Sequence, residues 1–234
     1  MDVLVGGFVE AVRLLLSGDA ATWEITGLTL RISLTATLIA AIVGVPLGAA
    51  VALTSFRGRR VVLAAANTGM GLPPVVVGLF VTVLLWRSGP LGAFGLLYTP
   101  TAMIIAQAAI ATPIVVALVA TAVQQVDPDF LVQMQGLGAT RVRALAALLG
   151  EARLPLLAAA MAAFGAVVSE VGAAQMVGGN IAGETRVLTT AAVLATSRGQ
   201  FSLAIAFGLI LLAIAFVVNL VLTIVGQRQS AAVR

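Results

Sequence analysis

Apolar residues in this chain fall into five long stretches separated by short polar segments. Each stretch reaches the ~20 residues that an α-helix needs to cross about 30 Å of hydrocarbon. Glycine and proline interrupt most of them, which is common in membrane helices because neighbouring helices satisfy the freed backbone groups. The pattern predicts an all-α, polytopic transmembrane helical bundle of about five spans. The expected spans are 28–53, 61–86, 100–123, 155–177 and 202–226.

The N-terminal residues have a different pattern. The segment 2–17 mixes an apolar face with Asp2, Glu10 and Arg13, and its apolar run is too short to cross a bilayer. We expect an amphipathic helix in the outer membrane interface that ends near Gly18, with a frayed tail as the alternative. The predicted domains are the interfacial helix and linker over 1–27, the transmembrane domain over 28–226 and a cytoplasmic tail over 227–234.

The largest polar interruption covers residues 124–154. Asp127 before Pro128 has the composition of a helix N-cap. Apolar residues then recur at steps of three and four on both sides of Gly136 and Gly138, so we expect two short amphipathic helices hinged at these glycines. Such a hairpin suits docking against another protein, and an ordinary interfacial loop is the alternative.

Composition supports a membrane location. Hydrophobic residues make up 61% of the 234 residues and charged residues 9%, against about 25% charged in soluble domains. A soluble fold of this size could not bury so much apolar surface. The chain has no Cys, His or Lys, which excludes thiolate or imidazole metal sites, Cys- or His-based catalysis and a phosphate-loop lysine. We therefore expect no catalytic residue, metal or cofactor in this chain.

The 13 cations, all arginines, indicate topology. They form no basic stripe with aromatic residues, so nucleic acid is not an expected partner. Eight lie at the span ends on the side of the hairpin and five on the other side, which places the hairpin and the C-terminus in the cytoplasm and the N-terminus outside. The first group is Arg57, Arg59, Arg60, Arg141, Arg143, Arg153, Arg228 and Arg234, and the second is Arg13, Arg31, Arg87, Arg186 and Arg198.

The hairpin carries a family resemblance. Leu137-Gly138-Ala139, followed by a basic amphipathic helix and Leu154-Pro155, resembles the motif with which type I ABC importer permeases dock into their ATPase subunit. The family has an acidic residue and two alanines where this chain has Val132-Gln133-Met134, and the interval from Gly138 to Pro155 is longer by about one helical turn. The resemblance implies that the ATPase-coupling residues are Met134, Gly136, Leu137, Gly138, Ala139, Thr140 and Arg141.

A second resemblance concerns the substrate. Residues 169–190 are similar to the segment after the coupling loop in molybdate and tungstate permeases, and 67–78 with 88–92 make tungstate permeases the nearest likeness, over about 20–226. It implies a molybdate/methionine importer-like architecture in a bacterial or archaeal inner (plasma) membrane, with the protein as a homodimer. It also implies two ATP-binding subunits that carry ATP and Mg, and a periplasmic or lipid-anchored substrate-binding protein.

The implied activity is import of tungstate by alternating access. The alternatives are a molybdate or sulfate permease of the same class and an ion-coupled secondary anion transporter, although the inverted repeats usual in the latter class are not visible in the sequence. Membrane lipid surrounds the chain in every case.

An oxyanion needs a route rich in hydrogen-bond donors, because even one charge in hydrocarbon costs about 2.5–3.5 kcal/mol on insertion scales. Backbone N–H groups in the glycine-rich segment, threonine hydroxyls and one arginine are the candidates near the outer end. A glycine-rich turn with a solvated arginine is the alternative, and for Glu170 we expect a structural role or a gating switch. The expected pathway and gate residues are Asn67, Thr68, Ser169, Glu170, Gly179, Asn180, Thr185, Arg186 and Thr189.

Overall fold

The structure, a computed structural model, describes residues 2–231 and the side chains of residues 3–226. Within these residues the regular elements are all helices. They are α1 (Asp2–Leu16), α2 (Ala20–Leu53), α3 (Arg59–Met70), α4 (Pro74–Leu85), the short 3₁₀ helix η1 (Gly92–Phe94), α5 (Pro100–Gln124), α6 (Phe130–Gly136), α7 (Arg141–Glu151), α8 (Arg153–Val168), α9 (Gly172–Gly178), α10 (Leu188–Ser197) and α11 (Phe201–Ala231).

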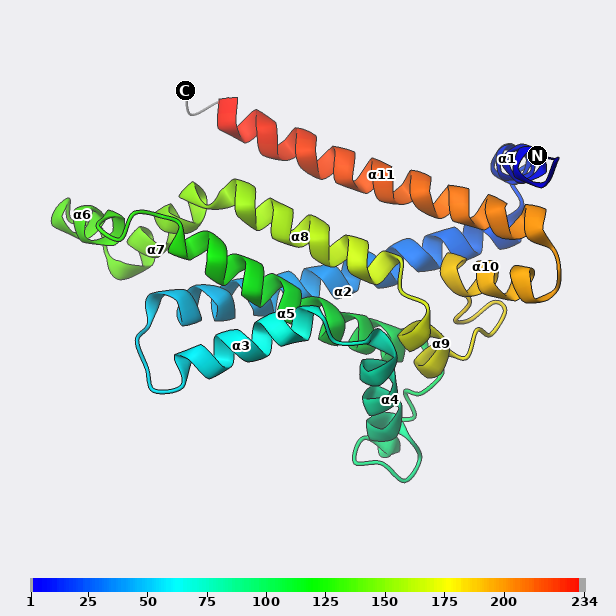
Figure 1. Cartoon of the computed structure of the whole chain (residues 1–234), viewed down its shortest axis with the longest axis horizontal. Helices are drawn as coiled ribbons and strands as arrows, with labels where there is room; N and C mark the ends of the chain where they lie inside the picture. Colours follow the sequence, from blue (N-terminus) through cyan, green and yellow to red (C-terminus); the bar gives the residue numbers. More distant parts are fainter. Residues whose placement is uncertain (1, 232–234) are drawn as a thin grey trace.

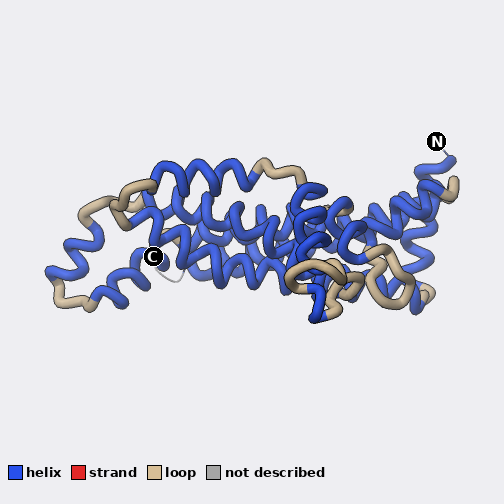
Figure 2. Tube along the Cα trace, turned by 90° about the horizontal axis from the view of Figure 1, so that it is seen from below, coloured by secondary structure: helices blue, strands red, loops and turns tan. Residues whose placement is uncertain are grey.

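Four long helices, α2, α5, α8 and α11, run along the long axis of an elongated molecule (Figures 1 and 2). Three helical segments of the described chain are long and apolar enough to cross a membrane alone: Ala20–Leu53, Pro100–Gln124 and Phe201–Gly226. The total is up to five if each of two bent helix pairs, α3 with α4 and α7 with α8, counts as one span. This confirms the predicted all-α bundle of about five spans. The central helix is α5, because 61% of its apolar window is buried against 28% in α2 and 17% in α11.

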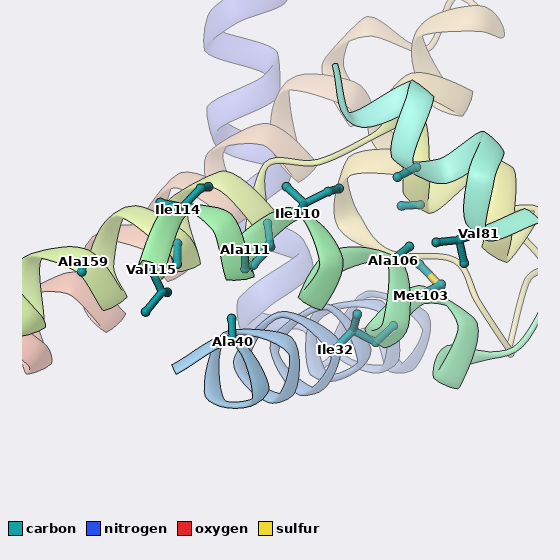
Figure 3. Close-up of a cluster of buried hydrophobic side chains, with 14 of the residues drawn as sticks. Ile32, Ala40, Val81, Met103, Ala106, Ile110, Ala111, Ile114, Val115 and Ala159 are labelled. Carbon is teal, nitrogen blue, oxygen red and sulfur yellow. The ribbon is translucent and has the colours of Figure 1, made fainter. Parts of the chain in front are cut away.

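Small residues allow α2 and α5 to pack closely. A Cβ atom on Gly44 would lie 2.8 Å from the Val115 side chain, and one on Gly48 would lie 2.7 Å from the carbonyl oxygen of Val116. Interfaces of this kind are typical of membrane helices, where close backbone approach replaces the hydrophobic drive of water. Figure 3 shows the buried core along α5, with Ile32 and Ala40 contributed by α2.

The first span begins earlier than predicted. α2 starts at Ala20 instead of residue 28, because the carboxylate of Asp19 accepts a hydrogen bond from the backbone N–H of Thr22 at 2.8 Å and caps the helix. The second span is broken more sharply than a proline kink requires: α3 and α4 meet at 102° across Gly71, Leu72 and Pro73. In Figure 1, α4 accordingly points away from the long axis of the bundle.

The prediction of one continuous span over 155–177 is wrong. α8 ends at Val168 and α9 begins only at Gly172. At the break, the hydroxyl of Ser169 donates to the carbonyl of Gly165 at 2.8 Å, and the carboxylate of Glu170 accepts the backbone N–H of Ala173 at 2.8 Å. Such local side-chain hydrogen bonds compete with the helical pattern.

The hairpin helices are α6 and α7. The prediction that Asp127 caps the first of them is wrong, since α6 begins at Phe130 and the Asp127 carboxylate accepts the N–H of Asp129 at 2.8 Å in an Asx turn. The second helix has Thr140 as its N-cap, whose hydroxyl accepts the N–H of Arg143 at 3.4 Å. The Asx turn therefore moves the start of the hairpin two residues beyond Pro128.

The first residue of α3 is tied to the end of α2. The Arg59 guanidinium donates from Nε to the carbonyl of Val51 at 2.8 Å and from Nη2 to that of Ala52 at 3.1 Å. A cation is favourable there, because the carbonyl groups of a helix C-terminus carry partial negative charge. The 54–58 turn is thus closed by a side chain as well as by the backbone.

Helix α1 and the C-terminal end of α11 lie near opposite ends of the molecule (Figure 1). Helix α1 is followed by Gly18 in the left-handed conformation, at φ +67°, and it packs on α11 where Gly7 lies against Ile205. Its position in the membrane interface stays a prediction. In the predicted tail, helix α11 continues to Ala231, whereas residues 232–234 and the side chain of Arg228 lie outside the described part.

Candidate functional site

The hairpin lies at one end of the molecule. Figure 1 shows α6 and α7 at the same end as the turn between α2 and α3, whereas α1 and α10 lie at the opposite end. The arginines of that turn, Arg57, Arg59 and Arg60, are therefore at the same end as Arg141 and Arg143 of α7. The predicted membrane orientation depends on these arginines lying at the same end of the molecule.

Apolar side chains are exposed at the tip of this hairpin. Leu137 is 84% exposed and Val142 is 78% exposed, whereas Ala144 and Leu148 on the other face of α7 are buried. Between the helices Gly138 has φ +87°, a conformation that disfavours any other residue. The turn at Gly138 therefore leaves the side chains of Leu137 and Val142 exposed at the tip of the hairpin.

The predicted coupling residues all belong to this turn. Met134 and Gly136 lie in α6, and Leu137 caps its C-terminus. Gly138 and Ala139 form the connection to α7. Thr140 is the N-cap of α7, and Arg141 is its first residue.

At the other end, the glycine-rich segment between α9 and α10 is held by a buried threonine. Thr185 is fully buried, and its hydroxyl donates to the carbonyl of Gly178 while it accepts the N–H of Ile181 at 3.0 Å. Gly179, at φ +71°, begins the segment. The hydroxyl of Thr185 therefore closes the loop and is not turned outward as a donor.

Arg186 and Asn180 form a second contact in this loop. The guanidinium donates from Nε to the amide oxygen of Asn180 at 3.1 Å and from Nη2 to its backbone carbonyl at 3.3 Å. Asn180 has φ +55°, a strained conformation for a residue with a side chain. Both side chains are half-buried, so the loop holds one fixed cation near its surface.

Glu170 and Thr189 are also engaged within the protein. Besides accepting the N–H of Ala173, Glu170 offers its backbone carbonyl to the hydroxyl of Thr189 at 2.9 Å. Both residues are buried, at 9% and 6% exposed. These contacts join the break after α8 to the first turn of α10.

The remaining predicted pathway residues lie apart from this group. Asn67 and Thr68 are exposed on α3, on the opposite side from Ala66 and Gly69, which are buried. Ser169 is exposed at the end of α8. Among the described residues, no hydrogen bond joins Asn67 or Thr68 to the loop that contains Arg186.

One residue that the sequence did not indicate is Tyr98, in the connection from α4 to α5. Its N–H donates to the carbonyl of Val177 at 2.8 Å, and its ring lies so close to Gly179 that a Cβ there would be 2.9 Å from it. Tyr98 has φ +64°, and within the described chain only Asn180 shares this property among non-glycine residues. Tyr98 and Asn180, the two non-glycine residues with positive φ, therefore lie on either side of the contact between the α4–α5 connection and the start of the α9–α10 loop.

Comparison with known proteins places this geometry in a family. The chain matches the model of the binding-protein-dependent transport system inner membrane component over residues 44–231. It is 39% identical to the tungstate uptake system permease protein of Peptoclostridium acidaminophilum, over 95% of this chain and 97% of that protein. It is 42% identical to a probable anion ABC transporter permease protein of Haloferax volcanii, over 84% and 87% of the two chains.

A solved structure of the MetNI methionine ABC transporter, in an inward-facing conformation, has the same fold. The TM-score is 0.67, and the match covers 91% of this chain and 94% of that one at 20% identity. The likeness confirms the type I ABC importer permease architecture. This chain belongs to the family of inner-membrane components of binding-protein-dependent transport systems, and it is an integral membrane transport subunit.

Proposed function

We propose that this chain is the permease subunit of an ATP-driven importer of tetrahedral oxyanions, and that tungstate is its substrate. The observation that carries the proposal is the 39% identity to a tungstate uptake permease along nearly the whole of both chains. Molybdate is the second candidate, and sulfate is a third, because these dianions share their shape and charge. An ion-coupled secondary transporter would not need the hairpin described above.

The proposed partners are two ATP-binding subunits, a second copy of this chain and a periplasmic or lipid-anchored substrate-binding protein. The exposed Leu137 and Val142 support contact with an ATPase, since such side chains are unfavourable in water. The exposed polar side chains of Asn67 and Thr68 support a second copy, because intramembrane polar groups face protein or water. ATP and Mg would be held by the partner subunits.

The proposed orientation puts the hairpin and the C-terminus in the cytoplasm and the N-terminus outside. ATP binding closes the two ATPases and moves the hairpins, and the attached helices turn as rigid bodies to open the pathway outward. Hydrolysis and product release reverse the motion. No bond of the substrate is made or broken, so the permease supplies a route and not a catalytic group.

Arg186 and Asn180 are the proposed anion-facing residues of the outer gate. Thr185, Thr189 and Glu170 make hydrogen bonds inside the protein, which supports a role in holding this gate in shape. Gly179 provides the turn, and Asn67, Thr68 and Ser169 remain candidates for the pathway deeper in the membrane.

Transport can be tested with the complete transporter in proteoliposomes. We expect the detergent-solubilised chain to co-purify with an ATPase, and a tungstate-loaded binding protein to stimulate ATP hydrolysis and tungstate uptake. Molybdate and sulfate should compete less well. Uptake of tungstate that needs an ion gradient and no ATP would refute the proposal, and a preference for molybdate would favour the second candidate.

Coupling can be tested by Gly138→Asp. An added side chain at φ +87° strains the turn, so we expect loss of ATPase association or of stimulated hydrolysis. Gly150→Asp is the matched control, because Gly150 lies in the same hairpin, has a helical backbone and has open space where a Cβ would be added. Equal activity of the two variants would show that the turn does not couple.

The gate can be tested by Arg186→Glu, which reverses the charge beside Asn180. We expect uptake to fall while association with the ATPase is unchanged, because the hairpin lies at the other end of the molecule. Wild-type uptake in this variant would remove the assignment.

A further inference from the structure

A small cavity lies between α10 and α11, at the end of the molecule opposite the hairpin (Figure 1). Its volume of ≈ 110 Å³ is enough for an ion with four oxygen atoms or for a few water molecules. Apolar side chains form part of its wall, among them Leu194, Leu203 and Phe207. The polar part of the lining comes from Arg186, Arg198 and Gln200.

The charges in this lining are all positive. Arg186 and Arg198 both contribute, and no carboxylate does. Among the described residues the one ion pair joins Arg13 to Glu10, at 3.7 Å, so neither arginine of the cavity is neutralised by an acidic side chain. Glu10 lines a separate hollow that shares Gln200 and Leu203 with this cavity, and its carboxylate is paired with Arg13.

The two arginines differ in how they are held. Arg186 is half-buried and fixed by Asn180 through Nε and Nη2, which leaves Nη1 without a hydrogen bond to the described residues. Arg198 is exposed at the C-cap of α10. One cation is thus preorganised and the other is free to close on a ligand.

Arg186 and Arg198 line the same cavity beside an apolar wall. An anion bound in it would be attracted by both positive charges. The planar N–H fork of arginine matches the oxygen atoms of an oxyanion, and the amide of Gln200 adds further N–H donors. Charge-assisted hydrogen bonds of this kind are stronger than those between neutral groups. The lining therefore has the chemistry of a site for a small, doubly charged oxyanion.

We propose that this cavity is an oxyanion-binding site of the permease itself, which holds the substrate between its release from the binding protein and its passage through the outer gate. The proposal rests on the function proposed above and adds Arg198 and Gln200 to the residues that recognise the substrate. A concave space of this size favours a small ion over an acidic protein surface. Arg186 belongs to both the cavity and the gate loop, so binding of the oxyanion in the cavity would be linked to its passage through the gate.

The test measures tungstate binding to the assembled transporter in nanodiscs without the binding protein, by equilibrium dialysis. For Arg198→Gln we expect the half-saturating concentration of tungstate to rise about tenfold, the effect of one charge-assisted hydrogen bond. Arg198→Lys, which keeps the charge without the fork, should lie between this variant and the wild type. Arg87→Gln is the matched control, because Arg87 lines a separate pocket next to Trp86 and should leave binding unchanged.

Uptake and the affinity for the binding protein are measured on the same variants. Unchanged tungstate binding in Arg198→Gln, or no detectable binding in a wild-type transporter that takes up tungstate, would overturn the proposal. Weaker docking of the binding protein with unchanged anion binding would also overturn it, since the surface would then serve that protein. A wild-type transporter that takes up no oxyanion would instead refute the proposed function.

Discussion

The hydroxyl of Thr185 makes two hydrogen bonds that close the glycine-rich loop between α9 and α10, so we expect the conformation of this loop to depend on it. It donates to the carbonyl of Gly178 and accepts the N–H of Ile181, and the side chain is fully buried. Thr185→Val keeps the shape of the side chain and removes the hydroxyl. Two backbone groups then lose their partner: the buried carbonyl of Gly178 and the partly buried N–H of Ile181.

The magnitude follows from these two hydrogen bonds. A buried acceptor left without a partner costs about 1–3 kcal/mol. The N–H of Ile181 adds less because it is only partly buried, so the closed loop should lose about 2–3 kcal/mol relative to an open one. Each 1.4 kcal/mol is a factor of about ten in an equilibrium constant. The population of open loop should therefore rise on the order of a hundredfold.

Hydrogen exchange measures this opening directly, because the amide of Ile181 is one of the groups that the hydroxyl protects. In peptides that cover residues 178–187, we expect exchange in Thr185→Val to be faster on the order of a hundredfold, with lower tungstate uptake. Thr185→Ser keeps the hydroxyl and should retain most of the protection. Thr35→Val is the control, since the exposed Thr35 hydroxyl bonds only within α2, to the carbonyl of Arg31.

Equal exchange in the wild type and Thr185→Val would show that this loop is held by something other than the hydroxyl. The reasoning would also fail if Thr35→Val produced the same acceleration, because the effect would then be a general loss of stability.

Three further predictions concern other parts of the chain. Gly78→Leu should lower the thermal stability of the purified protein by several degrees, because a Cβ at Gly78 would lie 2.7 Å from the Cα of Ala173; an unchanged melting temperature would contradict the α4–α9 contact. The chain has no cysteine, so Arg141→Cys should react with impermeant maleimide only from the cytoplasmic side and Ser17→Cys only from outside. The hydrogen bonds from Thr22 hold the pKa of Asp19 below its usual value of 3.8. A depressed pKa in the folded state stabilises the start of α2 above that value, and the protection of this turn in hydrogen exchange should be lost as the pH falls below 3.8; Asp19→Asn should keep the cap without this pH dependence.

The sequence predicted the helical class and the number of apolar segments well, because hydrophobic length is set by the thickness of the bilayer. It did not predict where the segments break. The break after Val168 depends on the carboxylate of Glu170 reaching the N–H of Ala173, and a polar residue in an apolar run does not indicate which backbone group it will bind. The 102° turn before Pro74 exceeds what two prolines alone require. It places α4 against α9, where Gly78 lies close to Ala173, and such a contact between distant segments is not visible in the sequence.

The candidate site was predicted in part. The glycines, Asn180 and Arg186 stand out by composition, and the structure joins the latter two by hydrogen bonds. The hydrogen bond from the Thr185 hydroxyl to the Gly178 carbonyl and the contact of Tyr98 with Gly179 join residues that are apart in the sequence, so the sequence alone did not predict them. The proposed coupling and pathway roles remain predictions, because they involve other chains and other conformations.

The hydrogen bonds of Arg59 have a consequence for how α2 and α3 can move relative to each other. The guanidinium is bound to the carbonyls of Val51 and Ala52, so it ties the start of α3 to the end of α2. A change of angle between α2 and α3 at residues 54–58 would have to break both hydrogen bonds. The next break along the chain is Gly71-Leu72-Pro73, which no side-chain clamp of this kind bridges among the described residues. In the proposed transport cycle, a movement passed along α3 would therefore change the tilt of α4 before the angle between α2 and α3.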